Sequence, residues 1–231
     1  MKKILTIALA LIIGTNYNSL IAKNKKAFEG VISYSIEMSG DPSITSSLES
    51  MPAGMLTAVL KTKGQYSMMS IMGQKTFLDT KKGIITTLVD MSMLGMGSYC
   101  IENPYDGSTQ GQQKYELSGE TKTICGYKAE KIQLGETNGT TIEVWITREI
   151  AIEAGVPMIP GADGFVPLQF DIQTAATGMG TMKITLTAKE IKQQKVTTDE
   201  VTAPKDCQKM NQEELNNLLK AIQSFGGDFE E

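Results

Sequence analysis

The sequence predicts a mainly β fold (α+β), built around an antiparallel sheet and completed by a short internal helix and a C-terminal amphipathic helix. Three patterns support this prediction. Short alternating segments bounded by Gly, Asp and Lys recur at roughly ten-residue spacing between residues 56 and 102, which is typical of a meander. Asn138–Gly139 lies between two alternating runs, and this dipeptide favours a type I′ hairpin turn because both central positions need positive φ. Near the C-terminus the apolar period changes to that of a helix.

The first 22 residues, Met1–Ala22, have the pattern of an export signal. Lys2 and Lys3 precede the uncharged apolar run Ile4–Gly14, and Ala22 offers a small residue at a cleavage point. The apolar run is shorter than the roughly 20 residues that span a bilayer, which favours a cleaved signal. A retained membrane anchor is the alternative interpretation. We therefore expect a periplasmic chain, cleaved near Ala22, whose residues 23–231 form a single domain without a transmembrane span.

Alternation of side chains locates the predicted strands. In Phe28–Met38, Ile32, Tyr34 and Ile36 fall on one apolar face. In Thr121–Gln133, Gly126 is expected at a bulge or bend of one strand region. The other predicted strands are Leu56–Thr62, Gln65–Met72, Lys75–Asp79, Gly83–Asp90, Gly97–Glu102, Lys114–Leu117, Lys128–Leu134, Thr141–Thr147, Phe165–Thr174 and Gly180–Lys192, with polar loops at Ser39–Gly54 and Asn103–Gln113.

Two helices are predicted. Arg148–Ala154 is expected to form one or two turns before Gly155. Asn211 and Glu214 have the spacing of a capping box at the start of a C-terminal helix, expected over residues 209–227. Its apolar residues recur at i, i+3, i+4 and i+7, namely Leu215, Leu218, Leu219 and Ile222. We interpret this helix as a cover for the sheet; a detachable partner helix is the alternative.

Composition excludes several classes of function. The chain contains no histidine, which removes the commonest general base and metal ligand. Its formal net charge is −4 and it has one tryptophan, Trp145, so nucleic acid is not an expected partner. We expect a non-enzymatic protein that needs no cofactor.

The three cysteines, Cys100, Cys125 and Cys207, are far apart in sequence and form no CxxC pair. In an oxidising compartment they allow one disulfide and one remaining thiol. Cys125 and Cys207 flank segments that could approach each other, but the sequence does not decide the pairing.

Methionine is unusually frequent, with 14 residues in the chain. Because unbranched thioethers adapt to irregular apolar shapes, methionines could line a surface that accepts variable acyl chains. The predicted ligand-binding residues are Met68, Met72, Met91, Met93, Trp145 and Met182. Ordinary core packing is the alternative for all of them. The sulfur-rich run from Met91 to Cys100 raises a third alternative, Cu(I) binding.

Several segments together resemble a bacterial envelope family known as domain of unknown function 4412. They are Phe28–Tyr34, Thr121–Ile132, Val144–Ile150, Gly164–Lys192 and Val201–Lys205, in that order. The resemblance implies the fold of the lipoprotein-localisation proteins (LolA/LolB-like), a curved, open half-barrel with a hydrophobic concavity. It supplies no catalytic residues.

These observations together predict a periplasmic protein that binds a hydrophobic ligand, either a lipid or a lipoprotein acyl chain, in a Met/Leu-lined concavity. The alternative is a structural or interaction module that fills its own concavity and contacts another envelope protein.

Overall fold

In the computed structural model, the described residues are 27–40, 56–91, 97–105, 116–137, 140–157, 159, 164–176, 180–211, 213–215 and 217. The predicted signal Met1–Ala22, nearly all of the loop Ser39–Gly54, the Asn138–Gly139 turn and most of the predicted C-terminal helix lie outside these residues.

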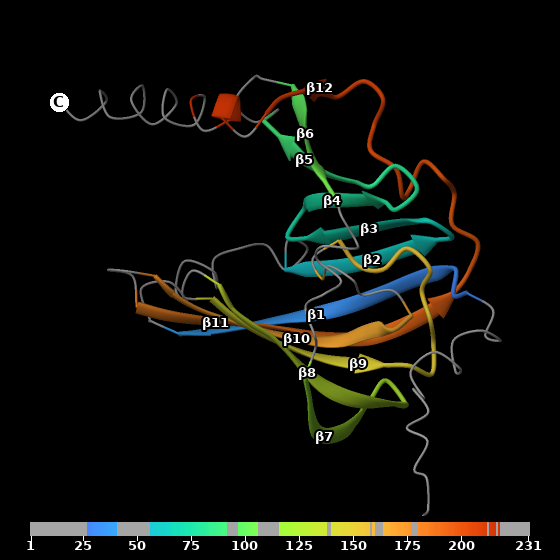
Figure 1. Cartoon of the computed structure of the whole chain (residues 1–231), viewed down its shortest axis with the longest axis vertical. Helices are drawn as coiled ribbons and strands as arrows, with labels where there is room; N and C mark the ends of the chain where they lie inside the picture. Colours follow the sequence, from blue (N-terminus) through green and yellow to red (C-terminus); the bar gives the residue numbers. More distant parts are fainter. Residues whose placement is uncertain are drawn as a thin grey trace, which may run out of the picture.

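The described chain forms one open twelve-stranded sheet (Figure 1). Its strand order is β12-β6-β5-β4-β3-β2-β1-β11-β10-β9-β8-β7. All neighbouring strands are antiparallel except β12 and β6, which are parallel. The strands are β1 (Gly30–Gly40), β2 (Thr57–Lys63), β3 (Tyr66–Ile71), β4 (Gln74–Asp79), β5 (Ile84–Asp90), β6 (Ser98–Pro104), β7 (Glu116–Ile124), β8 (Tyr127–Thr137), β9 (Thr140–Thr147), β10 (Val166–Ala176), β11 (Gly180–Gln193) and β12 (Gln208–Lys209). The prediction of a mainly β, antiparallel fold is confirmed.

Two meanders meet at the centre of the sheet. Strands β2 to β6 pair in sequence order, and so do β7 to β11. The first strand, β1, joins them by pairing with β2 on one side and β11 on the other, so that Ile32 lies opposite both Leu60 and Ile191. The N-terminal strand is therefore central in the sheet.

The strands pair as the hairpin predicted at Asn138–Gly139 requires, and the chain forms a second hairpin that was not predicted. Strands β8 and β9 pair up to Thr137 opposite Thr140, as the Asn138–Gly139 dipeptide predicted. The prediction of one strand region over Thr121–Gln133 is wrong. The chain turns sharply at Cys125 and Gly126, both at positive φ (51° and 82°), and forms the β7–β8 hairpin.

The predicted helix at Arg148–Ala154 is also wrong, because this segment forms bends. Its backbone bonds to a residue distant in sequence: the amide of Phe28, just before β1, donates to the carbonyl of Ala151 at 2.8 Å. Ile152 and Ala154 are buried in the same segment. Burial of these alternating residues against the sheet replaces the helix.

The C-terminal capping box is confirmed. The amide of Glu214 donates to Oδ1 of Asn211 at 2.8 Å, and the amide of Asn211 donates to Oε2 of Glu214 at 2.8 Å. Helical residues follow at 213–215 and 217. Leu215 is buried against Met91 and Ile101.

The two faces of the sheet carry different cores. One face, which we name the core face, holds the largest hydrophobic cluster, including Ile32, Leu60 and Phe170. The connection from β9 to β10 covers part of it with Ile152, Val156, Ile159 and Phe165. The opposite face of β1 to β6, which we name the strap face, is crossed by residues 194–207. There Val196 and Val201 pack against Met68 and Phe77. We name residues 194–207 the strap.

Candidate functional site

A hollow of about 390 Å³ opens on the core face. Its lining residues come from two pairs of strands and from the turn after β3, and none of them is charged: Met69, Ile71, Met72, Gln74, Thr76, Ile172, Ile184 and Leu186. Met69 and Leu186 are almost fully buried, whereas the other residues are partly or fully exposed. The hollow therefore has a buried apolar base and open apolar walls.

This hollow shows that the core face is concave. Thr76 of β4 and Ile172 of β10 both line it, although β3, β2, β1 and β11 lie between these two strands. Neighbouring strands are about 4.8 Å apart, so β4 and β10 would be about 24 Å apart in a flat sheet. A hollow of this size contacts both strands only because the sheet curves toward its core face. The expected curved, open half-barrel is confirmed. We name this site the concave hollow.

The β3–β4 turn places Met72 at the rim of the concave hollow. Met72 has φ of 51° and is followed by Gly73 at 85°, the positive values of a type I′ turn. A methionine rarely adopts this conformation, and the adjacent strands hold it there. Its flexible thioether consequently lies beside Ile71 at the edge of the apolar wall.

On the strap face, ion pairs and hydrogen bonds hold the beginning of the strap. Lys61 contacts Glu200 at 2.6 Å, and Glu29 accepts the amide of Val196 at 3.0 Å. The hydrogen bond from Lys61, reinforced by Thr197, lowers the pKa of Glu200 to about 2. The amide of Val196, helped by Lys63, likewise lowers the pKa of Glu29.

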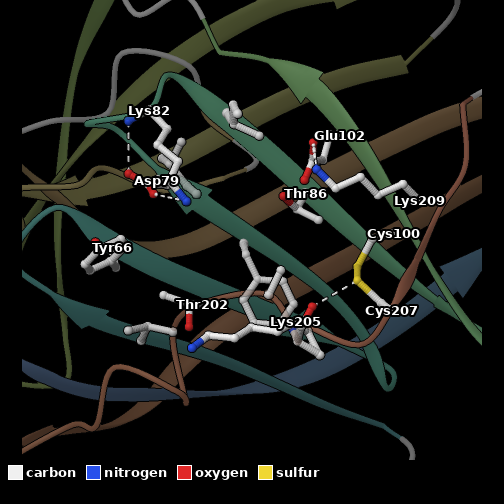
Figure 2. A pocket seen from close by; sticks show the side chains of 16 residues that line it. Tyr66, Asp79, Lys82, Thr86, Cys100, Glu102, Thr202, Lys205, Cys207 and Lys209 are labelled. Atoms are coloured by element: carbon white, nitrogen blue, oxygen red, sulfur yellow. Dashed lines mark hydrogen bonds and ion pairs between the residues drawn. A yellow bond between two sulfur atoms is a disulfide. The ribbon is translucent and has the colours of Figure 1, made fainter.

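A disulfide between Cys100 and Cys207 fixes the other end of the strap (Figure 2). Beside it β12 pairs with β6, and Lys209 contacts Glu102 at 2.9 Å. The sequence had left the pairing open. The third cysteine, Cys125, is free; burial raises the pKa of its thiol, which donates to the carbonyl of Ala188 at 3.0 Å.

Two further hollows flank strap residues 202–205 on this face. The larger has a volume of about 800 Å³ and contains Met68, Phe77 and Leu88 together with charged residues of the strap and of β2 and β4. The smaller, of about 340 Å³, is drawn in Figure 2; Lys82, Lys205 and Lys209 line it beside Asp79 and Glu102. Unlike the concave hollow, both hollows have charged rims.

The predicted methionines are distributed over several surfaces. Met72 lines the concave hollow, and Met68 lies on the strap face beneath Val196 and Val201. Met182 lies on β11 opposite Gly40 and is not among the residues that line these three hollows.

Met91 is buried against Ile101 and Leu215, and Met93 lies outside the described residues. The structure thus brings one predicted methionine to the concave hollow. Ligand binding by the others stays a prediction.

Trp145 belongs to the buried core but faces away from the concave hollow. It alternates along β9 with Val144, which pairs with Phe170 on the core face. Its ring is covered by Lys122, whose Nζ lies 3.9 Å from the ring centroid. Burial lowers the pKa of Lys122. This position favours the structural interpretation of Trp145.

Sequence reasoning missed most of the concave hollow. Met69, Ile172, Ile184 and Leu186 line it, yet none was predicted as a site residue. The available signal was the alternation of the segments that became β10 and β11, which places Ile172, Ile184 and Leu186 on one face of that hairpin.

The Cys100–Cys207 disulfide removes one ligand of the Cu(I) alternative, which otherwise stays a prediction. Cys100 is oxidised in a disulfide and offers no thiolate to the run that begins at Met91. Across the described ranges, no three His, Cys, Asp or Glu residues gather in a way that could hold a metal ion. Within the same ranges, no helix is long and apolar enough to cross a membrane.

The fold and its hollows define a curved, open antiparallel β domain with a strapped face. Residues 56–218 match the family described as N-glycanase peptide, N-terminal domain, and the chain belongs to that family. This is not the domain of unknown function 4412 that the sequence segments resemble. Comparison with curated proteins gives no match.

Two crystal structures of PNGF-II, in space groups P21 and C2, are similar to this chain with a TM-score of 0.54 and 14% identity. The similarity covers 83% of this chain and 33% of theirs, so the chain spans about a third of the length of those proteins. At this identity the likeness establishes a shared fold. A LolA superfamily protein from Nitrosomonas europaea also matches, with a TM-score of 0.34 and 9% identity over 78% of this chain and 92% of that protein. That similarity is too low to support an argument.

Proposed function

We propose that this chain is a non-enzymatic protein of the cell envelope that binds an uncharged apolar chain, such as a lipid tail or a lipoprotein acyl chain. The observation that supports this proposal is the concave hollow, whose lining has no charged residue. Its volume of about 390 Å³ lies within the range of small-molecule pockets, roughly 300–1,000 Å³.

Burial of apolar surface supplies the binding energy, at about 25 cal/mol for each Å² removed from water. Met69 and Met72 add tolerance of shape because their side chains can repack around chains of different length. Gln74 and Thr76 are the polar residues of the lining; their side chains can donate a hydrogen bond to the hydroxyl or ester oxygen of a ligand.

The proposed location is the periplasm. The signal pattern of Met1–Ala22 supports it, and so does the Cys100–Cys207 disulfide, which persists in an oxidising compartment. The absence of histidine from the sequence supports a role in binding rather than catalysis. The family description names an N-glycanase, but the matching part is its N-terminal domain, so it assigns no reaction to this chain.

The test uses a substitution that fills the concave hollow with a larger side chain. Ile172→Trp adds an indole to its wall, whereas Gln173→Trp adds the same group to the opposite face of β10. Native mass spectrometry and calorimetry with decanol should show binding to the wild type and to Gln173→Trp. Ile172→Trp should weaken it at least tenfold. Equal binding by the two variants, or no binding by the wild type, would contradict the proposal.

A second candidate function is that of an interaction module. It is supported by the family description as an N-terminal domain and by the greater length of the similar PNGF-II structures. A photo-crosslinking amino acid at Ile184, on the wall of the concave hollow, separates the two functions in intact envelopes. A lipid adduct supports ligand binding, and a single protein adduct supports the interaction module.

A further inference from the structure

The larger hollow on the strap face combines an apolar floor with a charged rim. Val59, Met68, Phe77 and Leu88 come from four neighbouring strands and form the floor. The backbone groups of these strands pair within the sheet, so the floor offers side chains and no free strand edge. A peptide that binds by strand addition therefore has no backbone to pair with. A flexible alkyl chain needs only the apolar surface.

The rim carries an unbalanced positive charge. Lys61 is neutralised by Glu200 at 2.6 Å. Lys75 and Lys205 also line the hollow, and among the described residues neither has an acidic partner. One acid, Asp199, shares the rim with them. The rim thus has more lysines than acids on a chain whose formal charge is −4, which favours an anionic group.

The strap makes this hollow a preformed site. Strap residues 202–205 form one wall, and Lys205 lines the hollows on both sides of it. Figure 2 shows Lys205 in the smaller of the two. Ion pairing at Glu200 and the disulfide at Cys207 hold that wall from both sides. Because this wall is ordered before the ligand binds, binding loses no free energy in ordering the wall.

We infer that the larger strap-face hollow binds a single-chain amphiphilic carboxylate, that is, a free fatty acid. The alkyl chain lies on Met68, Phe77 and Leu88, and the carboxylate meets Lys75 and Lys205. This site is separate from the concave hollow, which offers no charged group and takes the uncharged chain of the proposed function.

The test compares decanoate with decanol, which share an alkyl chain and differ in charge. In Lys75→Gln/Lys205→Gln, decanoate affinity should fall at least tenfold while decanol affinity is unchanged. Lys128→Gln/Lys189→Gln makes the same change in net charge at two exposed positions outside the hollow and should keep both affinities. Equal decanoate affinity in the two variants, or an equal loss in both, would overturn the inference.

A second measurement uses the disulfide. The variant Cys100→Ala/Cys207→Ala lacks the covalent bond that holds the wall formed by strap residues 202–205. Its decanoate affinity should therefore fall, while decanol binding persists. Unchanged decanoate affinity in a variant that keeps the wild-type far-ultraviolet spectrum would contradict a preformed site. If that variant does not fold, the lysine variants decide the question. Loss of decanol binding alone, as in Ile172→Trp, would affect the proposed function and leave this inference intact.

Discussion

Removing the Cys100–Cys207 disulfide should cost several kcal/mol of unfolding free energy. The bridge joins residues 107 positions apart, so it closes a long loop in the unfolded chain. The loop-entropy relation then gives about 4.8 kcal/mol at 25 °C. This value is a large fraction of the roughly 5–15 kcal/mol that stabilises an ordinary domain. The double variant Cys100→Ala/Cys207→Ala should therefore unfold at much lower urea concentration than the wild type.

Trp145 provides the assay. It is the one tryptophan of the chain and is buried beneath Lys122, so its fluorescence reports the loss of this packing. Linear extrapolation of urea curves gives the free energies to compare. Cys125→Ala, at the free and exposed cysteine, is the matched control and should change stability by less than about 1 kcal/mol. A loss below about 1 kcal/mol in the double variant would refute the loop-entropy reasoning.

Two further changes test the packing around the strap and the central strand. Glu200→Gln should destabilise the protein near pH 7, and its difference from the wild type should vanish as the pH falls toward 2; urea curves between these values measure it. In the folded protein the pKa of Glu200 is about 2, below its ordinary value. The charge on Glu200 therefore stabilises the folded state at pH values above the ordinary pKa, and this stabilisation is lost as the pH falls toward 2. Gly30→Ala should cost about 2 kcal/mol or more in the same assay, since a Cβ there would lie 2.1 Å from the carbonyl oxygen of Lys192. Gly97→Ala has nothing within 4 Å and should stay within about 0.5 kcal/mol of the wild type; equal effects of the two alanines would contradict the close packing of β1 and β11.

Strand pairing was predictable from the sequence where the residue types of a short turn indicate positive φ. The Asn138–Gly139 dipeptide predicted the β8–β9 pairing because few other residues accept positive φ at both positions. Cys125–Gly126 forms a two-residue turn with both residues at positive φ, and its residue types did not indicate it, since cysteine is uncommon at positive φ. The pairing of β1 with β11 depends on residues such as Ile32 and Ile191, which no local pattern connects.

The helix predicted at Arg148–Ala154 failed for a similar reason. The carbonyl of Ala151 bonds to Phe28, and Ile152 packs on a sheet assembled from distant strands, so long-range contacts override the local preference. The disulfide partner of Cys207 likewise depends on where the strap crosses the sheet.

The chemical character of the candidate site was predictable from the sequence, but most of its residues were not. The frequency of methionine indicated an adaptable apolar surface, and Met72 does line one. However, Met68 and its neighbour Met69 point to opposite faces of β3, so a one-residue difference decides which one reaches the concave hollow. Ile172 and Ile184 complete the hollow only because the sheet curves, and curvature is a property of the assembled strands.

The most direct test of the account is a crystal structure of the protein grown with 10-bromodecan-1-ol. The account predicts an anomalous bromine signal and a continuous alkyl chain in contact with Met69, Ile172 and Ile184, on the concave face. A concave hollow without the compound at a saturating concentration, or an alkyl chain bound only at another surface, would contradict the central claim.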